Sequence, residues 1–177
     1  MSDFPSFKEI YEQHTDMVFN LCLNYLQNEA DAEEVTQDVF IKVYRQLANF
    51  KGQATLKTWI YRISINQCQD FLKAKKRQKR FGFHIPVLWG NPAEGLPVLS
   101  DFKHPGVQLE DKEAVAYIFK NINDLPQQQK TALLLKVVED LSQKEIAAIL
   151  DISIKAVESL LSRARSNLQK KLDASEG

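Results

Sequence analysis

The sequence has few of the residues that metal sites, disulfide frameworks and catalytic centres require. Its 177 residues include two cysteines, Cys22 and Cys68, which lack the paired spacing of a zinc site. The three histidines, His14, His84 and His104, show no metal-ligand or catalytic-triad spacing, and there is no glycine-rich phosphate loop. We therefore predict no metal, no cofactor, no catalytic residue and no small-molecule substrate, and we expect a protein that is not an enzyme.

Long apolar runs are also absent. No stretch approaches the roughly 20 residues that span a bilayer. The opening MSDFPSFKEI lacks the basic start and apolar run of a signal peptide, and the low cysteine content fits a reducing compartment. These features predict a cytoplasmic protein.

The chain carries no net charge, because 23 basic residues balance 23 acidic ones. This balance hides a strong asymmetry along the chain. Residues 1–50 hold 3 basic and 9 acidic side chains, whereas residues 51–80 hold 9 basic side chains and 1 acidic. An acidic surface beside a basic one predicts two partners of opposite charge.

The apolar residues recur with the period of amphipathic helices. In the first 80 residues they predict helices from Phe7 to Tyr25, from Glu29 to about Ala48, and from a cap at Thr55 onward, with a break around Gly52. The inward positions are predicted to be Phe7, Ile10, Tyr11, Met17, Val18, Leu21, Cys22 and Tyr25 in the first helix, Ala32, Val35, Val39, Val43 and Leu47 in the second, and Trp59, Ile60, Ile63 and Phe71 in the third.

Glycine and proline gather in the middle of the chain, where they interrupt every helical period. This composition predicts a flexible linker over residues 81–108, which joins a domain at residues 1–80 to a second domain at residues 109–177. Scattered apolar residues such as Trp89 favour docking of part of this linker on a surface.

Helical periodicity resumes after the linker. One helix is predicted to start after Asp124, with Asp124 as its cap and Pro126 in its first turn. Ser142 and Glu145 form a capping box for a short helix to Leu150, and a last helix runs to about Leu172. No segment alternates with period two, so the predicted fold is all-α, with two small helical domains and no sheet. The inward positions are predicted to be Val115, Ile118, Phe119 and Ile122 before Asp124, and Leu133, Leu134, Val137 and Val138 after it.

The segment EIAAILDISIKAVESLLSRARSNL has the layout of a helix-turn-helix. Small residues in its first helix let the two helices approach closely, and the second helix turns Val157, Leu160 and Leu161 inward. A capped helix pair in any small bundle gives the same pattern, but DNA binding in a major groove is the favoured interpretation. The exposed side chains of the second helix are predicted to be Lys155, Ser159, Ser162, Arg163 and Asn167.

Positive charge is concentrated in the run from Lys73 to Arg80, on a helix that already carries Lys57 and Arg62. Along a phosphate backbone this run would supply salt-dependent affinity without sequence information. A solvated helix end is the alternative. The nearby aromatic residues Phe50 and Trp59 favour stacking of single-stranded bases, although Trp59 fits a core position better.

The second predicted helix carries an acidic face formed by Asp31, Glu34, Gln37 and Asp38. One interpretation is an ordinary solvated helix side. The other is a docking surface for a basic partner, which is the more specific hypothesis of the two.

Together these segments resemble the bacterial sigma-70 family, and in particular its extracytoplasmic-function (ECF) group. The resemblance covers residues 7–77 and 110–172. DAEEVTQDVF looks like the core-polymerase-binding helix of that group, and FKGQATLKTWIYRISINQCQDFL is similar to its promoter-melting and minus-ten segment. DLP at residues 124–126 and LSQKEIAAILDISIKAVESLLSRARSNL look like its reader of the minus-thirty-five element.

The resemblance implies a bacterial sigma factor that binds core RNA polymerase and promoter DNA and is controlled by an anti-sigma factor. It implies contacts with the β′ clamp helices and the β flap of the polymerase, and capture of a flipped base at the opened minus-ten element. The implied contact residues are Asp31, Glu34, Gln37 and Asp38 for the core polymerase; Phe50, Lys51, Gln53, Thr55, Lys57, Trp59, Arg62, Lys73, Lys76 and Arg77 for the minus-ten element; and Lys155, Ser159, Ser162, Arg163 and Arg165 for the minus-thirty-five element.

Two residues depart from the family pattern. Glu158 stands where a basic residue is common, which weakens the attraction to phosphate. Asp151 stands where a turn glycine is common, but Asp tolerates left-handed dihedrals, so we expect the turn to persist. Two other functions stay open: a decoy that binds an anti-sigma factor without starting transcription, and a free-standing helix-turn-helix regulator.

Overall fold

The computed structural model describes residues 5–80 and 109–175, and every regular element within these two ranges is a helix. The all-α fold predicted from the sequence is therefore confirmed. The predicted linker over residues 81–108, with its docking segment, lies outside the described residues. The elements are α1 (Phe7–Leu26), α2 (Glu29–Gln46), the short 3-10 helix η1 (Leu47–Asn49), α3 (Leu56–Arg80), α4 (Leu109–Asn123), α5 (Gln127–Val137), α6 (Gln143–Leu150) and α7 (Ile154–Ser175).

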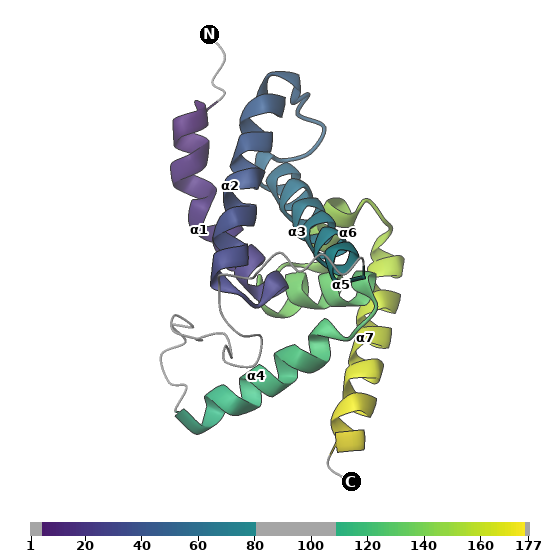
Figure 1. The fold of residues 1–177 in the computed structure, drawn as a ribbon. Coiled ribbons are helices and arrows are strands. Elements are labelled where there is room, and N and C mark those ends of the chain that lie inside the picture. Colours follow the sequence, from purple (N-terminus) through teal and green to yellow (C-terminus); the bar gives the residue numbers. More distant parts are fainter. Residues whose placement is uncertain (1–4, 81–108, 176–177) are drawn as a thin grey trace.

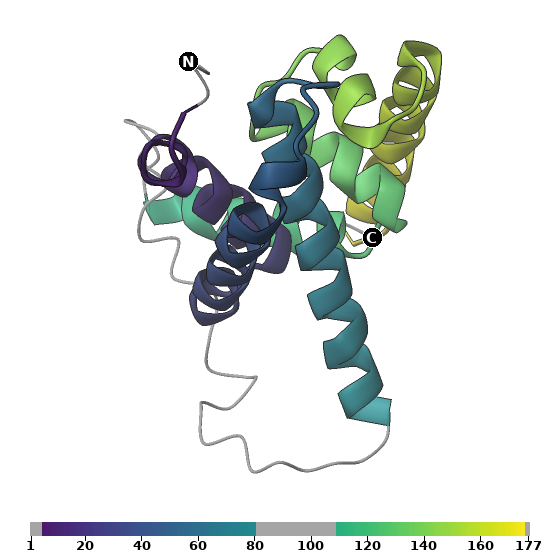
Figure 2. The same cartoon turned by 90° about the horizontal axis from the view of Figure 1, so that it is seen from above.

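The helices form two groups that pack against each other. In the first group, α1 and α2 lie side by side and α3 packs against both (Figure 1). The second group consists of α4 to α7, with the long α7 at its outer edge (Figure 1). The last turns of α3 project beyond the other helices, which leaves the end of this helix open to solvent (Figure 2).

The first three helices begin at residues that satisfy the free backbone N–H groups of a first turn. Ser6 and Glu9 form a capping box at the start of α1, and Asn28 accepts a hydrogen bond from the backbone N–H of Asp31. The hydroxyl of Thr55 accepts from the N–H of Thr58, 3.1 Å away, as predicted for the start of α3. Gly52 has a φ of +67° in the break before α3, a backbone conformation that glycine adopts without steric cost.

The helix-turn-helix begins with the predicted capping box. Glu145 N–H donates to the Ser142 hydroxyl, and the Glu145 carboxylate accepts from the Ser142 N–H at 2.8 Å. The turn between α6 and α7 runs through Asp151, which adopts the left-handed conformation with φ 56° and ψ 47°. The expectation that Asp keeps this turn intact is confirmed.

The predicted start of the helix after Asp124 is wrong. Pro126 itself is the N-cap of α5, which begins at Gln127 and has no side-chain cap hydrogen bond. The Asp124 carboxylate lies instead 3.8 Å from the amine of Lys171 on α7. Asp124 therefore ties the turn to a neighbouring helix and does not cap its own.

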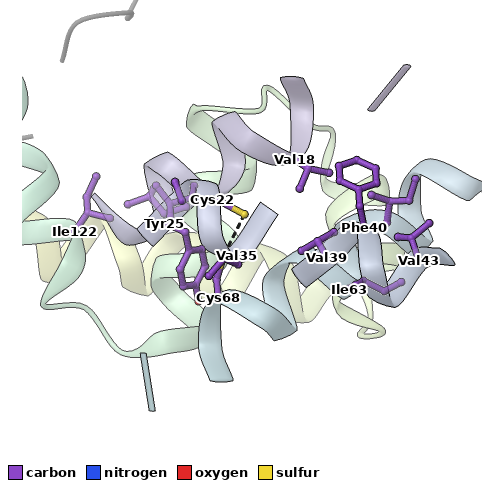
Figure 3. Close-up of a cluster of buried hydrophobic side chains, with 14 of the residues drawn as sticks. Val18, Cys22, Tyr25, Val35, Val39, Phe40, Val43, Ile63, Cys68 and Ile122 are labelled. Atoms are coloured by element: carbon purple, nitrogen blue, oxygen red, sulfur yellow. Dashed lines mark hydrogen bonds between the residues drawn. The ribbon is translucent and has the colours of Figure 1, made fainter. Parts of the chain in front are cut away.

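The core of the first group contains most of the predicted inward residues. Val18, Val35, Val39 and Val43 are fully or almost fully buried between α1, α2 and α3 (Figure 3). Cys22 and Cys68 are both fully buried as free thiols, with their sulfurs 3.7 Å apart (Figure 3). The two cysteines thus serve as small apolar side chains of this core.

Three residues predicted to point inward are exposed. Tyr11 is 45% exposed because it lies at the margin of the α1–α2 pair, where its ring packs edge-on against Phe40 with 4.8 Å between centroids. Ile118 on α4 is 39% exposed, and Val137 at the end of α5 is 66% exposed. Single apolar side chains on a surface are common and carry little cost.

The prediction missed a second buried face of α3. Tyr61 and Ile65 are 2% and 4% exposed, because α5 and α6 cover the side of α3 that faces away from α2. Their shared cluster, which we call the interdomain core, consists of Leu21, Tyr61, Ile65, Ala132, Leu135, Leu141, Ile146, Ala147, Ile149, Val157, Leu160 and Leu161.

Polar contacts accompany the interdomain core. The Tyr25 hydroxyl lies 2.8 Å from the hydroxyl of Thr131 on α5. The amine of Lys130 donates to the backbone carbonyl of Tyr25 at 2.7 Å and sits 4.4 Å from the centre of its ring. Burial lowers the pKa of Lys130 to about 8, because the charged amine loses water, and the positive charge of Lys76 lowers it further.

Hydropathy along the helices gives no membrane span. Within the two described ranges, no helix is both long enough and apolar enough to cross a bilayer.

The capping box of α6 predicts the stability of a matched pair of variants. We expect Ser142→Ala to lower the free energy of unfolding by about 1 kcal/mol, because the backbone N–H of Glu145 loses its acceptor and the Glu145 carboxylate loses the Ser142 hydroxyl. Ser166→Ala, in the exposed middle of α7, should change it by less than about 0.5 kcal/mol. Urea unfolding followed by circular dichroism measures both, and equal effects would contradict the role of the cap.

The buried amine of Lys130 predicts a pH dependence. Its pKa is lower in the folded chain than the ordinary value of 10.5, so between pH 8 and 10.5 the unfolded state binds more protons. The contribution of Lys130 to the free energy of unfolding is therefore lowest below pH 8 and rises with pH above it. Relative to Lys130→Met, the free energy of unfolding of the native chain should rise by about 2 kcal/mol between pH 7 and pH 9.5. The exposed Lys120→Met is the control, and a constant difference for both variants would contradict the prediction.

Candidate polymerase and DNA interfaces

The acidic face predicted for the second helix lies on α2 and points into solvent for three of its four residues. Glu34, Gln37 and Asp38 are exposed, and their spacing of three and four residues places them on one side of the helix. Asp31 is turned toward α3, where its carboxylate lies 2.5 Å from the amine of Lys75. The side chain of Asp31 is 20% exposed.

The loop before α3 is built around an aromatic pair. Phe50 and Trp59 pack with their ring centroids 5.0 Å apart and a 45° angle between the ring planes. Both rings are half-buried, and Trp59 also packs on the core of the first group. Lys51 and Gln53 are exposed beside this pair. The loop therefore presents polar side chains and the outer surface of two aromatic rings to solvent.

The helix α3 carries cations along its whole length, but they differ in their surroundings. Lys57 is exposed, with its amine 5.9 Å from the centre of the Tyr61 ring. Near the other end, Lys73 pairs with Asp70 at 3.4 Å. A surface hollow of about 500 Å³ is lined by Asp70, Lys73, Lys76, Arg77 and Arg80. Four of these five lining residues are cations, so the hollow favours an anionic partner.

Arg62 lies in the contact between the two helical groups. Its guanidinium donates to the carbonyl oxygens of Ala148 and Ile149, at the end of α6, with distances of 2.5 to 3.2 Å. It also lies 3.9 Å from the Asp151 carboxylate. The last carbonyls of a helix have no partner within the helix and carry partial negative charge, so a guanidinium stabilises them.

The second helix of the helix-turn-helix is α7, and its outer face is polar. Lys155, Ser159, Ser162, Arg163 and Arg165 are all exposed on it. Glu158, which departs from the family pattern, is also exposed on this face. The inward residues Val157, Leu160 and Leu161 are buried, as predicted.

The prediction of an exposed Asn167 is wrong. Its side-chain amide donates to the amide oxygen of Gln129 on α5 at 2.8 Å, and the residue is half-buried. Asn167 thus holds α7 against α5.

Residues that the sequence interpretation missed lie between the two groups. The Tyr61 hydroxyl donates to the Glu139 carboxylate at 2.7 Å. Burial, together with this carboxylate, raises the pKa of Tyr61, and burial raises the pKa of Glu139. Nothing in the sequence signals these partners, because they are 78 positions apart and Glu139 lies in the connection after α5.

Comparison with known protein families agrees with the two helical groups. The family model of sigma-70 region 2 matches residues 10–78, and the model of sigma-70 region 4 matches residues 118–168. The first match covers α1 to α3, and the second covers the helix-turn-helix with the helix before it.

Characterised relatives extend the similarity over the whole chain. The RNA polymerase sigma-H factor of Pseudomonas aeruginosa is 30% identical over 170 residues, which cover 96% of this chain and 88% of the relative. The ECF RNA polymerase sigma-E factor of Haemophilus influenzae is 31% identical over 173 residues, covering 96% and 89%. That of Escherichia coli K12 is 29% identical, covering 96% and 88%.

Two solved structures share the fold. One is the sigma factor RpoE in complex with the anti-sigma factor NepR from Bartonella quintana, with a TM-score of 0.63, 23% identity, and coverage of 94% of this chain and 96% of that chain. The other is CnrH in complex with the cytosolic domain of CnrY, with a TM-score of 0.64, 23% identity, and coverage of 95% and 88%.

The fold and the matched regions define a transcription initiation factor, and the chain belongs to the sigma-70 family, in its ECF group. Members of this family are not enzymes. They bind core RNA polymerase and promoter DNA and direct promoter-specific initiation. The family resemblance predicted from the sequence is thus confirmed, and the match to region 2 argues against a free-standing helix-turn-helix regulator.

Proposed function

We propose that the acidic face of α2 binds the β′ clamp helices of core RNA polymerase. Glu34, Gln37 and Asp38 are exposed together on this face, so a basic partner helix can reach all three. Asp31 takes part at the edge of the face, where it exchanges Lys75 for a cation of the partner. Ion pairs at the rim of an interface chiefly set orientation and association rate, which suits the docking of a factor that must bind in one register.

The second part of the proposal assigns the minus-ten element to the start and the outer surface of α3. The Phe50–Trp59 pair offers an aromatic surface on which a flipped base can stack, beside the polar side chains of Lys51, Gln53, Thr55 and Lys57. Phosphates of the opened strand follow the cations farther along the helix, which are Arg62, Lys73, Lys76 and Arg77.

The third part assigns the minus-thirty-five element to α7. Lys155, Ser159, Ser162, Arg163 and Arg165 share its exposed face, which is the arrangement of a recognition helix in a major groove. The carboxylate of Glu158 on the same face repels a DNA phosphate at its own position. This repulsion narrows the set of promoter sequences that the helix binds. The second domain also contacts the β flap of the polymerase.

The observation that carries the proposal is the separation of charge and exposure. The acidic exposed face lies on α2, the basic projecting end belongs to α3, and the polar recognition face lies on α7. The polymerase and the two promoter elements can therefore bind separate surfaces. Binding of one promoter element raises the effective concentration of the other. We place the domain limits at residues 1–80 and 109–177 and the protein in the bacterial cytoplasm.

We further propose control by an anti-sigma factor. The two solved structures described above are sigma factors, RpoE and CnrH, each in complex with a partner, NepR and CnrY. A partner of this kind would cover the α2 face and hold the factor away from the polymerase.

Run-off transcription tests the proposed function. Purified bacterial core polymerase is incubated with a genomic promoter library, with and without the protein. New transcripts that need the protein support the proposal and identify its promoters. A protein that binds an anti-sigma factor but neither binds core polymerase nor yields transcripts would be a decoy, and the proposal would fail.

The acidic face predicts a loss of polymerase binding on charge reversal. The double variant Glu34→Lys/Asp38→Lys should weaken binding to core polymerase roughly 10- to 100-fold, because two attractive pairs become repulsive. The matched control is Glu12→Lys/Asp16→Lys on the exposed side of α1, which carries the same change in charge. Binding is measured by fluorescence anisotropy of labelled protein. Similar losses in both double variants would point to net charge and not to the α2 face.

The recognition face predicts a change in salt dependence. In the variant Arg163→Ala/Arg165→Ala, the slope of log affinity against log salt for promoter duplex should become shallower by up to about 1.8, since each lost phosphate contact removes about 0.9. Lys170→Ala, on an exposed position nearer the end of α7, is the control. An unchanged slope in the double variant would remove these two arginines from the DNA contact.

A further inference from the structure

Two thiols face each other in the core of the first helical group. Cys22 on α1 and Cys68 on α3 are fully buried, and the Cys68 thiol donates a hydrogen bond to the Cys22 sulfur at 3.7 Å (Figure 3). They are the two cysteines of the sequence, and 46 positions separate them. A disulfide bond is about 2.05 Å long, so the two sulfurs must approach by about 1.7 Å to form one.

The surroundings of the pair favour thiol chemistry over metal binding. Within residues 5–80 and 109–175, no group of three or more histidine, cysteine or acidic side chains could hold a metal ion. A structural zinc ion takes four such ligands. Two facing thiols that lack further ligands can instead be oxidised to a disulfide.

Hydrogen bonding makes the two thiols unequal. The hydrogen bond from Cys68 lowers the pKa of Cys22 against the effect of burial, and the nearby hydroxyl of Thr36 lowers it further. The same hydrogen bond, together with burial, raises the pKa of Cys68, although the positive charge of Lys130 opposes this rise. The thiolate is the nucleophile in thiol oxidation. Cys22 is therefore the thiol that attacks an oxidant, and Cys68 is the thiol that resolves the product.

The hydroxyl of Thr36 has no other assigned role. Thr36 lies on α2 and is buried, and within the described part of the chain its oxygen has no hydrogen-bond partner. A buried hydroxyl that makes no hydrogen bond costs stability, so its presence calls for an explanation. An oxygen atom added to the Cys22 sulfur would accept a hydrogen bond from this hydroxyl.

We propose that Cys22 and Cys68 form a peroxide-responsive switch, in which oxidation to a disulfide ties α1 to α3 and weakens the binding of core polymerase. The Cys22 thiolate attacks hydrogen peroxide, so that an S–O bond forms and the O–O bond breaks. The hydroxide that leaves takes up the proton released by Cys22 and becomes water. Cys68 then attacks the Cys22 sulfur: an S–S bond forms, the S–O bond breaks, and a second water leaves with the Cys68 proton.

The electron balance and the reversal of this step are simple. Two electrons pass from the two thiols to one peroxide molecule. Small thiols reduce the disulfide again by exchange through a mixed disulfide. In a reducing compartment the pair stays free, and the disulfides that do form there are transient and redox-sensing. Hydrogen peroxide is small and uncharged, so it reaches the buried sulfurs when the helices open locally.

The disulfide acts on polymerase binding through α2, which packs against both α1 and α3. Val35 on α2 is 1% exposed and lies next to the two sulfurs (Figure 3). Close-packed interiors transmit strain, so drawing α1 and α3 together displaces the buried side of α2. The opposite side carries Glu34, Gln37 and Asp38. This consequence therefore rests on the proposed binding of the acidic face to the polymerase.

Thiol counting and peptide mapping test whether the bond forms. The native protein is treated with hydrogen peroxide, which is then removed with catalase, and is unfolded in urea with iodoacetamide. We expect a monomer that takes up no iodoacetamide and yields a peptide pair joined through Cys22 and Cys68, whereas the untreated protein is alkylated at both. Cys68→Ala should instead hold a sulfenic acid on Cys22 that dimedone traps. Two free thiols after peroxide, or disulfides only between molecules, would overturn the proposal.

Binding to immobilised core polymerase tests the consequence. We expect peroxide to weaken binding of the native protein roughly fivefold or more, the usual size of coupling between two sites, and dithiothreitol to restore it. The matched control is Cys22→Ala/Cys68→Ala, in which peroxide can oxidise methionine but forms no disulfide, so its affinity should stay constant. Circular dichroism verifies that this variant keeps its helices.

Two outcomes separate the switch from the proposed function. Unchanged affinity of native protein that contains the disulfide would overturn the switch, and so would a loss that dithiothreitol does not reverse. Reduced native protein that fails to bind core polymerase would instead challenge the proposed function, because the thiol count does not depend on the polymerase.

Discussion

The burial of α3 on two opposite sides is the constraint on which the rest of the structure depends. Ile60, Ile63 and Cys68 face α1 and α2, whereas Tyr61 and Ile65 face α5 and α6. Each large apolar side chain stabilises the fold by about 1.5–3 kcal/mol when it leaves water, so an uncovered second face would be costly. Covering it brings two helical groups into one body. The hydroxyl of Tyr61 then needs a buried acceptor, and Glu139 supplies it at the expense of a raised carboxyl pKa.

Charge is distributed so that the same chain can meet an acidic and a basic partner. Carboxylates at the start of α2 lie where the positive end of the helix dipole stabilises them. Cations crowd the end of α3, where the dipole is negative and where the helix extends past its neighbours. The Lys75–Asp31 pair links the two surfaces inside one molecule. Local helix electrostatics and recognition therefore favour the same placement of charge.

Most of the fold could be predicted from local signals, because caps and periodicity act within a few residues. The capping box at Ser142, the cap at Thr55 and the left-handed Asp151 were all readable in this way. The start of α5 was misread because Asp124 interacts with α7, far along the chain. The second buried face of α3 was missed for the same reason, since Tyr61 and Ile65 lie outside the predicted apolar face and are covered only by a distant segment. For the site, residue types and spacing indicated three surfaces. They could not indicate that Arg62 is engaged by α6, because that contact depends on how two separate periodic patterns pack.

The turn at Asp151 combines two properties that usually belong to different residues. Its backbone takes the left-handed conformation that closes α6, and its carboxylate lies near Arg62. A glycine would give the backbone more freedom but would leave the guanidinium facing carbonyl oxygens alone. An asparagine would keep the turn and lose the charge. We therefore expect the effect of a substitution at position 62 to depend on the residue at position 151, although 88 residues separate them along the chain.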